Sequence, residues 1–200
     1  VVQTSKRKTY KMELPSKCID MVSCDKNYFI IVGRQGLWLI DKRTNALTLY
    51  TPFHSAQASK QRGAAEAVEI CASGLWEGKD AVIDSNGQIY MIEKAALKPL
   101  KRLYLPARPT FMTWKNGMGA VGCKDGSIML QRNQSTEVFK GHSSTVSSLI
   151  FSGDKLYSAS YDGNIIMWRL KQQNKRPLRL HETASWIRTM GVYNNQLYYG

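Results

Sequence analysis

Short apolar runs flank a turn dipeptide at four places along the chain. The dipeptides are Gln35-Gly36, Asn86-Gly87, Asp125-Gly126 and Asp162-Gly163, and their glycines are 51, 39 and 37 residues apart. Around Asn86-Gly87, for example, the apolar runs are residues 81–83 and 88–92. A strand, a tight turn and a second strand form a β-hairpin, for which Asn-Gly and Asp-Gly are strongly favoured turn pairs. The pattern therefore predicts an array of hairpins with a near-constant repeat length.

Further apolar segments lie between the hairpins and predict two more strands for each repeat. The predicted first strands are residues 18–22, 68–71, 110–114, 146–151 and 186–190. The predicted outer strands are residues 46–50, 100–105, 137–139 and 177–180. No segment has strong helical periodicity. The sequence thus predicts an all-β protein built from four-stranded units.

Residues 141–168 carry the most specific motif in the chain. They begin with Gly141-His142, continue through two segments of alternating apolar residues, turn at Asp162-Gly163 and end at Trp168. This segment resembles a repeat of the WD-repeat family of β-propellers, in which about forty residues make one four-stranded blade. It departs from the family pattern at Arg169, where an aspartate usually follows the tryptophan.

The resemblance implies a structural role for four polar residues of this segment. In such repeats a histidine, a serine of the second strand, the turn aspartate and the third-strand tryptophan form a chain of hydrogen bonds. The corresponding residues are His142, Ser158, Asp162 and Trp168. Each has a polar group that is costly to bury alone, and joining them satisfies all four. We therefore expect them to stabilise a blade rather than to form an active site.

The resemblance also implies the domain organisation, a partial β-propeller with four recognisable WD-type blades and an incomplete strand set at each end. The blades are expected at residues 18–50, 66–105, 108–139 and 141–180, with a loop insertion at 51–65. Residues 4–14 are expected to be the outer strand of a preceding blade, and residues 181–200 the start of a further one.

Closed propellers have about four to eight blades. We therefore expect residues 1–200 to form a single partial propeller that is a fragment of a larger ring. Its open blade edges favour association with a second copy. The alternative is a small closed ring of about five blades.

The composition is that of a folded chain with a strongly basic charge. Hydrophobic residues make up 43% of the chain and aromatic residues 10%, which excludes a disordered protein. The net charge of +13 indicates either an acidic partner, such as nucleic acid, or the solvated surface of one basic part of a larger protein.

The cysteines and the hydropathy bear on location. Cys18, Cys24, Cys71 and Cys123 lack the spacing of a metal site, and we expect free thiols in a reducing compartment. No apolar run has the length of a membrane helix, and we expect no signal peptide. The expected location is the cytoplasm, with the nucleus as the alternative, and no membrane partner is expected.

Motifs that would indicate catalysis are absent from the sequence. It contains no Gly-x-Ser-x-Gly elbow, no phosphate-binding glycine-rich loop and no His-Glu-x-x-His zinc motif. His54 and His181 are isolated from other chemistry-bearing residues. We therefore predict that the protein is not an enzyme and has no catalytic residue, metal site or cofactor.

A binding surface is the more promising site. In WD-repeat propellers the residue before the turn aspartate and two residues near the start of the first strand face one surface of the ring. The pre-turn positions here are Arg34, Ser85, Lys124 and Tyr161. The first-strand positions are Asp20, Arg108, Thr110, Thr145, Ser147, Trp186 and Arg188.

From these positions we predict a basic, aromatic-bearing face that binds an acidic protein segment. Its candidate residues are Arg34, Lys124, Tyr161, Trp186 and Arg188. Arginine, tyrosine and tryptophan are the side chains that most often anchor protein interfaces. The alternative interpretation is that all five are ordinary exposed residues of a scaffold.

The function that the resemblance implies is a non-catalytic scaffold or sensor module. It would mediate protein–protein interactions within a larger multidomain protein. The alternative is a nucleic-acid or phosphate-binding module that uses the basic surface. The salt dependence of binding distinguishes the two functions, because contacts with phosphates weaken steeply as the salt concentration rises.

Overall fold

The computed structural model describes residues 18–23, 28–44, 46–53, 68–93, 96–171, 177–194 and 196–200. The strand predicted at residues 4–14 lies outside the described residues, as does most of the insertion predicted at 51–65. No helix of the described part is long and apolar enough to cross a membrane.

Successive strands form four antiparallel sheets, each with four strands in sequence order. The first sheet has β1 (Cys18–Ser23), β2 (Tyr28–Gly33), β3 (Gly36–Asp41) and β4 (Leu47–Pro52). The second has β5 (Ile70–Trp76), β6 (Lys79–Asp84), β7 (Gln88–Glu93) and β8 (Ala96–Arg102). The third has β9 (Pro109–Lys115), β10 (Met118–Cys123), β11 (Ile128–Arg132) and β12 (Ser135–Phe139). The fourth has β13 (Val146–Ser152), β14 (Lys155–Ser160), β15 (Asn164–Arg169) and β16 (Leu178–Glu182).

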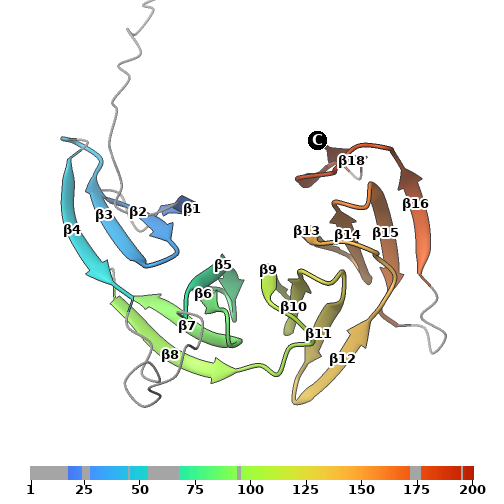
Figure 1. Cartoon of the computed structure of the whole chain (residues 1–200), viewed down its shortest axis with the longest axis horizontal. Coiled ribbons are helices and arrows are strands. Elements are labelled where there is room, and N and C mark those ends of the chain that lie inside the picture. The colour runs from blue at the N-terminus through green and yellow to red at the C-terminus, as the bar shows by residue number, and fades with distance from the viewer. Residues whose placement is uncertain are drawn as a thin grey trace, which may run out of the picture.

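A two-stranded hairpin of β17 (Met190–Tyr193) and β18 (Gln196–Tyr199) follows the four sheets. Figure 1 shows the sheets side by side in an arc, with β1, β5, β9 and β13 innermost and β4, β8, β12 and β16 outermost. The first sheet and the final hairpin lie at opposite ends of the arc and do not meet. The protein is therefore an all-β partial propeller, and the predicted fold class is confirmed. We call the four sheets blades 1 to 4.

The core lies between the blades. The second and third strands are buried along most of their length, as in β10 and β15, whereas the outermost strand β8 is largely exposed. Burial on both faces is expected when a sheet has a neighbour on each side. Each apolar cluster joins residues of two successive sheets. Phe139 of blade 3, for example, stacks on Trp168 of blade 4 with ring centroids 5.0 Å apart.

Three local predictions from the sequence were wrong. Strand β8 begins at Ala96 rather than at residue 100, although it contains Pro99. Proline is tolerated there because the outermost strand has one edge that needs no hydrogen-bond donors. Strand β17 begins at Met190 rather than at residue 186. The N–H of Ile187 donates instead to the carbonyl of Ser160 in blade 4, over 3.3 Å.

The third correction concerns the first hairpin. Gly33 pairs directly with Gly36, so the turn residues are Arg34-Gln35 and not Gln35-Gly36. In the other three hairpins the third loop residue is a glycine with positive φ, at Gly87, Gly126 and Gly163. The loop has three residues in blades 2 and 4 and four residues in blade 3. In each loop this glycine donates its N–H to the carbonyl of the last residue of the preceding strand. This is a common geometry for three-residue hairpin loops.

Candidate protein-interaction face

The four residues predicted to form a hydrogen-bonded chain lie in contact within blade 4. His142 Nδ1 is 3.0 Å from Asp162 Oδ2, and His142 Nε2 is 2.8 Å from Ser158 Oγ. Trp168 donates its Nε1–H to the same Ser158 oxygen over 2.9 Å. A carboxylate can only accept, so the neutral imidazole carries its proton on Nδ1 and accepts from Ser158 at Nε2. The polar groups of these four side chains therefore hydrogen-bond to one another.

Burial and hydrogen bonds set the charge states of His142 and Asp162 in this hydrogen-bonded network. Burial lowers the pKa of His142 below its ordinary value of 6.5, against the opposing attraction of Asp162. Partial burial works to raise the pKa of Asp162, but the backbone N–H groups of Ser143 and Asn164 and the contact with His142 bring it below its usual value. The native state therefore favours a neutral histidine beside an ionised aspartate.

This arrangement predicts a loss of stability as the pH falls below about 6.5. Because the pKa of His142 is lowered in the folded state, the unfolded chain binds a proton there that the native chain does not. Lowering the pH from about 7.5 to about 5.5 should reduce the free energy of unfolding by up to about 1.4 kcal/mol through this effect at His142. Urea unfolding at the two pH values measures the loss. A His142→Gln variant should lose less between them, and an equal loss would contradict the prediction.

The hairpin turns of blades 2 to 4 are held in one repeated way. The N–H of Ser85 donates to Glu69 O over 2.9 Å, that of Lys124 to Arg108 O over 2.9 Å, and that of Tyr161 to Thr145 O over 3.0 Å. Each bond sets the first turn residue beside the residue that leads into the first strand. The first strands line the inner side of the arc (Figure 1), so each of these turns lies beside the start of an inner strand, and we refer to this side as the face that carries the turns.

Three of the five predicted residues line one pocket on this face. Its volume is about 420 Å³, and its lining includes Arg34, Lys124 and Tyr161 together with Arg108. The hydroxyl side chains Thr110, Thr145 and Ser147 also line it. These residues come from blades 1, 3 and 4, and Cys71 of blade 2 completes the lining, so the pocket joins residues more than a hundred positions apart in the sequence. We call this cavity the turn-face pocket.

The other two predicted residues continue the same surface. The Tyr161 and Trp186 rings are stacked, with centroids 5.3 Å apart and planes at 22°. The guanidinium of Arg188 lies 5.9 Å from the centroid of the Trp186 ring. Trp186 is 62% exposed and Tyr161 is 37% exposed. We call the surface formed by Arg34, Lys124, Tyr161, Trp186 and Arg188 the turn face.

Other predicted positions form hydrogen bonds that join neighbouring parts of the propeller. Thr110 donates to the carbonyl of Val146 over 2.7 Å, and Ser147 to that of Ile187 over 2.5 Å. Each bond joins the inner strand of one blade to the chain that begins the next. Asp20 accepts from Ser73 over 2.6 Å and joins blades 1 and 2. Ser85 is not part of the pocket lining.

Glu69 belongs to this site and was missed by the sequence analysis. Its carboxylate accepts from Arg108 Nη2 over 2.7 Å and lies 3.5 Å from Arg34 Nη1, so it bridges two arginines of different blades. A signal was available in the sequence. Glu69 stands as far before Gly87 as Arg108 stands before Gly126 and Thr145 before Gly163.

The structure indicates the charge states of two groups at the turn-face pocket. The hydrogen bond to Glu69 raises the pKa of Arg108, so its guanidinium is permanently charged. Burial raises the pKa of the Cys71 thiol, which stays protonated near neutral pH. No group of three or more His, Cys, Asp or Glu side chains that could hold a metal occurs in the described part of the chain.

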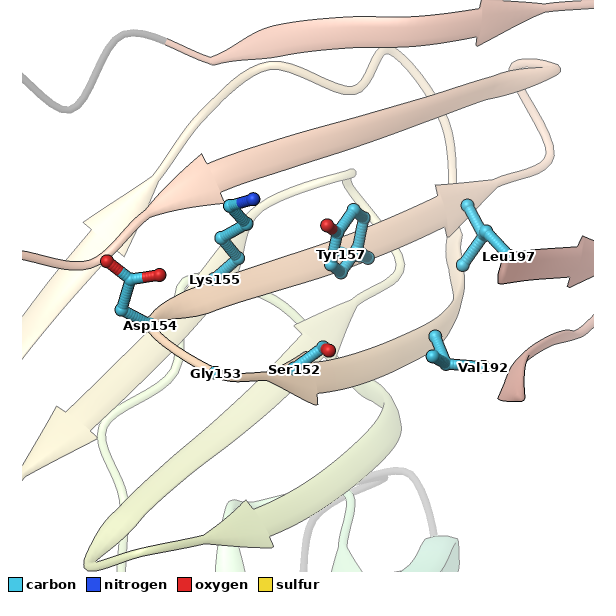
Figure 2. A pocket seen from close by; sticks show the side chains of 7 residues that line it. All are labelled: Ser152, Gly153, Asp154, Lys155, Tyr157, Val192 and Leu197. Carbon is cyan, nitrogen blue, oxygen red and sulfur yellow. The ribbon is translucent and has the colours of Figure 1, made fainter. Parts of the chain in front are cut away.

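A second pocket lies where blade 4 meets the final hairpin. Figure 2 shows Asp154, Lys155 and Tyr157 of blade 4 on one side and Val192 and Leu197 of the hairpin on the other. Its volume is also about 420 Å³. The hairpin thus covers only part of the blade 4 surface.

Comparison with known proteins identifies the fold and no family. No protein-family model matches the chain, and no curated protein matches it in sequence. The computationally designed protein Ika8 aligns over 92% of this chain, with a TM-score of 0.65 and 16% identity. This chain spans 55% of the length of Ika8.

Two further solved structures are similar. The computationally designed protein Ika4 aligns over 66% of this chain and 84% of its own length, with a TM-score of 0.52 and 20% identity. A chain in the crystal structure of a mitotic checkpoint complex aligns over 100% of this chain and 68% of its own, with a TM-score of 0.66 and 15% identity. At these identities the likeness is one of fold alone.

Proposed function

We propose that this protein is a non-catalytic protein-interaction module whose turn face binds an acidic segment of a partner protein. The observation that carries the proposal is the adjacency of five exposed side chains from three different blades and the segment leading into the final hairpin. Arg34, Lys124 and Tyr161 line one pocket, and Trp186 and Arg188 extend it through ring contacts. Basic and aromatic side chains grouped in this way are typical interface anchors for acidic partners.

The proposal includes kinship with WD-repeat propellers. Its support is the chain of His142, Ser158, Asp162 and Trp168 in blade 4, together with the four-stranded blades. We further propose that the module works as a scaffold or sensor within a longer protein in the cytoplasm. Free thiols at Cys18, Cys71 and Cys123 suit a reducing compartment.

Tyr161→Ala and Trp186→Ala should each weaken partner binding by about 2 kcal/mol, or roughly thirtyfold, because both rings are exposed on the turn face and stack on each other. The measurement is quantitative mass spectrometry of proteins retained from cell extract by each variant. Tyr104→Ala is the matched control, since Tyr104 is 88% exposed and lies outside the turn face. Retention of the same proteins by both turn-face variants would contradict the proposal. Retention of nucleic acid that salt abolishes would favour the alternative function.

We also propose that the open arc associates with a second copy of the chain. The hairpin at its end exposes Val192, Tyr193, Tyr198 and Tyr199. Strand β18 has a single partner strand among the described elements, and exposed strand edges promote pairing.

Light scattering should therefore give a mass above the 22.6 kDa of one chain over a dilution series. The excess mass should persist at high salt, because apolar contacts are little screened. Tyr193→Lys, which charges a side chain that is 69% exposed, should return the mass toward that of a single chain. A wild-type monomer at every concentration would contradict this proposal.

A further inference from the structure

The turn-face pocket has an excess of positive charge that the scaffold does not neutralise. Arg34, Arg108 and Lys124 line it, and Glu69 is the one carboxylate that pairs with any of them in the described structure. Three cations against one carboxylate leave a formal charge of +2. Lys124 is exposed and its ammonium group forms no ion pair with a described residue. An ammonium group beside two guanidinium groups that a carboxylate holds in place is an anion-binding arrangement.

The polar lining narrows the ligand further. The hydroxyl groups of Thr110, Thr145 and Ser147 donate to backbone carbonyls over 2.7, 3.1 and 2.5 Å. These three hydroxyl protons already form hydrogen bonds. The lining side chains that can still donate to a ligand are the charged groups of Arg34, Arg108 and Lys124 and the hydroxyl of Tyr161. Such donors favour a ligand with several acceptor oxygens and full negative charge.

We propose that the turn-face pocket binds the phosphate of a phosphorylated serine or threonine in the partner segment, an inference that rests on the proposed function. A phosphoryl group carries about −1.5 to −2 charges at neutral pH and three strong acceptor oxygens. It therefore matches the charge of +2 and the three converging cations, whereas one carboxylate leaves a cation unpaired. A nucleic-acid strand would instead need cations repeated along a groove, and here they converge in about 420 Å³.

Glu69 has a double effect in this pocket. By bridging Arg34 and Arg108 it orients both guanidinium groups before the ligand arrives. Its charge also competes with the phosphate for the same N–H donors. Glu69→Gln keeps the shape and a hydrogen-bond acceptor while removing the charge, so it should raise the affinity for phosphate by about threefold or more. A purely structural Glu69 would give lower affinity or no change.

The test uses the full chain and three peptide libraries that share random flanks. The central residue is phosphoserine, serine or glutamate. The phosphoserine library should be retained at least about tenfold better than the serine library, and inorganic phosphate should compete with it. Lys124→Gln should remove most of this preference, and Glu69→Gln should increase it. Lys155→Gln, in the separate pocket of Figure 2, is the control and should change nothing.

Equal retention of the serine and phosphoserine libraries would overturn the inference, as would a preference that survives in Lys124→Gln. Either result would leave the proposed function standing if Tyr161→Ala still releases protein partners, so the two failures are distinguishable. Retention of oligothymidylate in place of the phosphoserine library, with loss in Lys124→Gln, would assign the pocket to nucleic acid and also overturn the inference. Circular dichroism melting curves check that each variant is folded.

Discussion

Trp168→Ala is expected to lower the free energy of unfolding by about 3–5 kcal/mol, the usual cost of removing a buried tryptophan. The Trp168 side chain is 2% exposed and stacks on Phe139 across the boundary between blades 3 and 4. Its loss would open a cavity between two blades and leave Ser158 without the donor at Trp168 Nε1. The damage therefore reaches both the packing between blades and the hydrogen-bonded chain.

Urea unfolding followed by circular dichroism measures this loss, and the chain offers a matched control. Trp186→Ala removes the same side chain from a site that is 62% exposed, so its cost should stay within about 1 kcal/mol. Trp168→Phe should keep the stack with Phe139 and lose only the N–H donor, at about 1–2 kcal/mol. Similar losses in the two alanine variants would mean that Trp168 does not join the blades as described.

Local patterns predicted the hairpins and the sheets because each blade is a meander of neighbouring strands. Alternating apolar residues and a turn dipeptide act within a few positions of each other, so their spacing is visible in the chain. The same spacing indicated Arg34, Lys124 and Tyr161 as equivalent positions, and the structure places them around one pocket. Their role in binding remains a proposal.

Contacts between blades could not be predicted from local sequence patterns. The bridge from Glu69 to Arg34 and Arg108 depends on how blades 1 to 3 sit against one another, and no local pattern encodes that geometry. Strand β8 shows a second limit. Pro99 is unfavourable in a strand generally, and only its place on the outermost strand makes it acceptable. Sequence patterns thus predict the strands within a blade better than the contacts between blades.

Gly163→Ala is the second large effect that we expect, at about 3 kcal/mol or more of unfolding free energy. Gly163 has φ of +79°, and a Cβ atom there would lie 1.9 Å from the carbonyl oxygen of Thr183. That oxygen belongs to the backbone of the segment that leads away from blade 4, and the N–H of Thr183 donates to Gly163 O over 2.9 Å. Relieving the clash would therefore break a bond that anchors the chain between blade 4 and the final hairpin.

Gly117→Ala separates the clash from the backbone conformation. Gly117 has φ of +75°, nearly that of Gly163, but a Cβ atom added there would have no atom within 4 Å. Its cost should be about 1–2 kcal/mol, the penalty for a left-handed alanine. Thermal and urea unfolding of the two variants would measure the difference. Equal losses would contradict the close approach of Thr183 to the turn. A larger loss for Gly163→Ala would be due to that approach, because the two glycines have nearly the same φ.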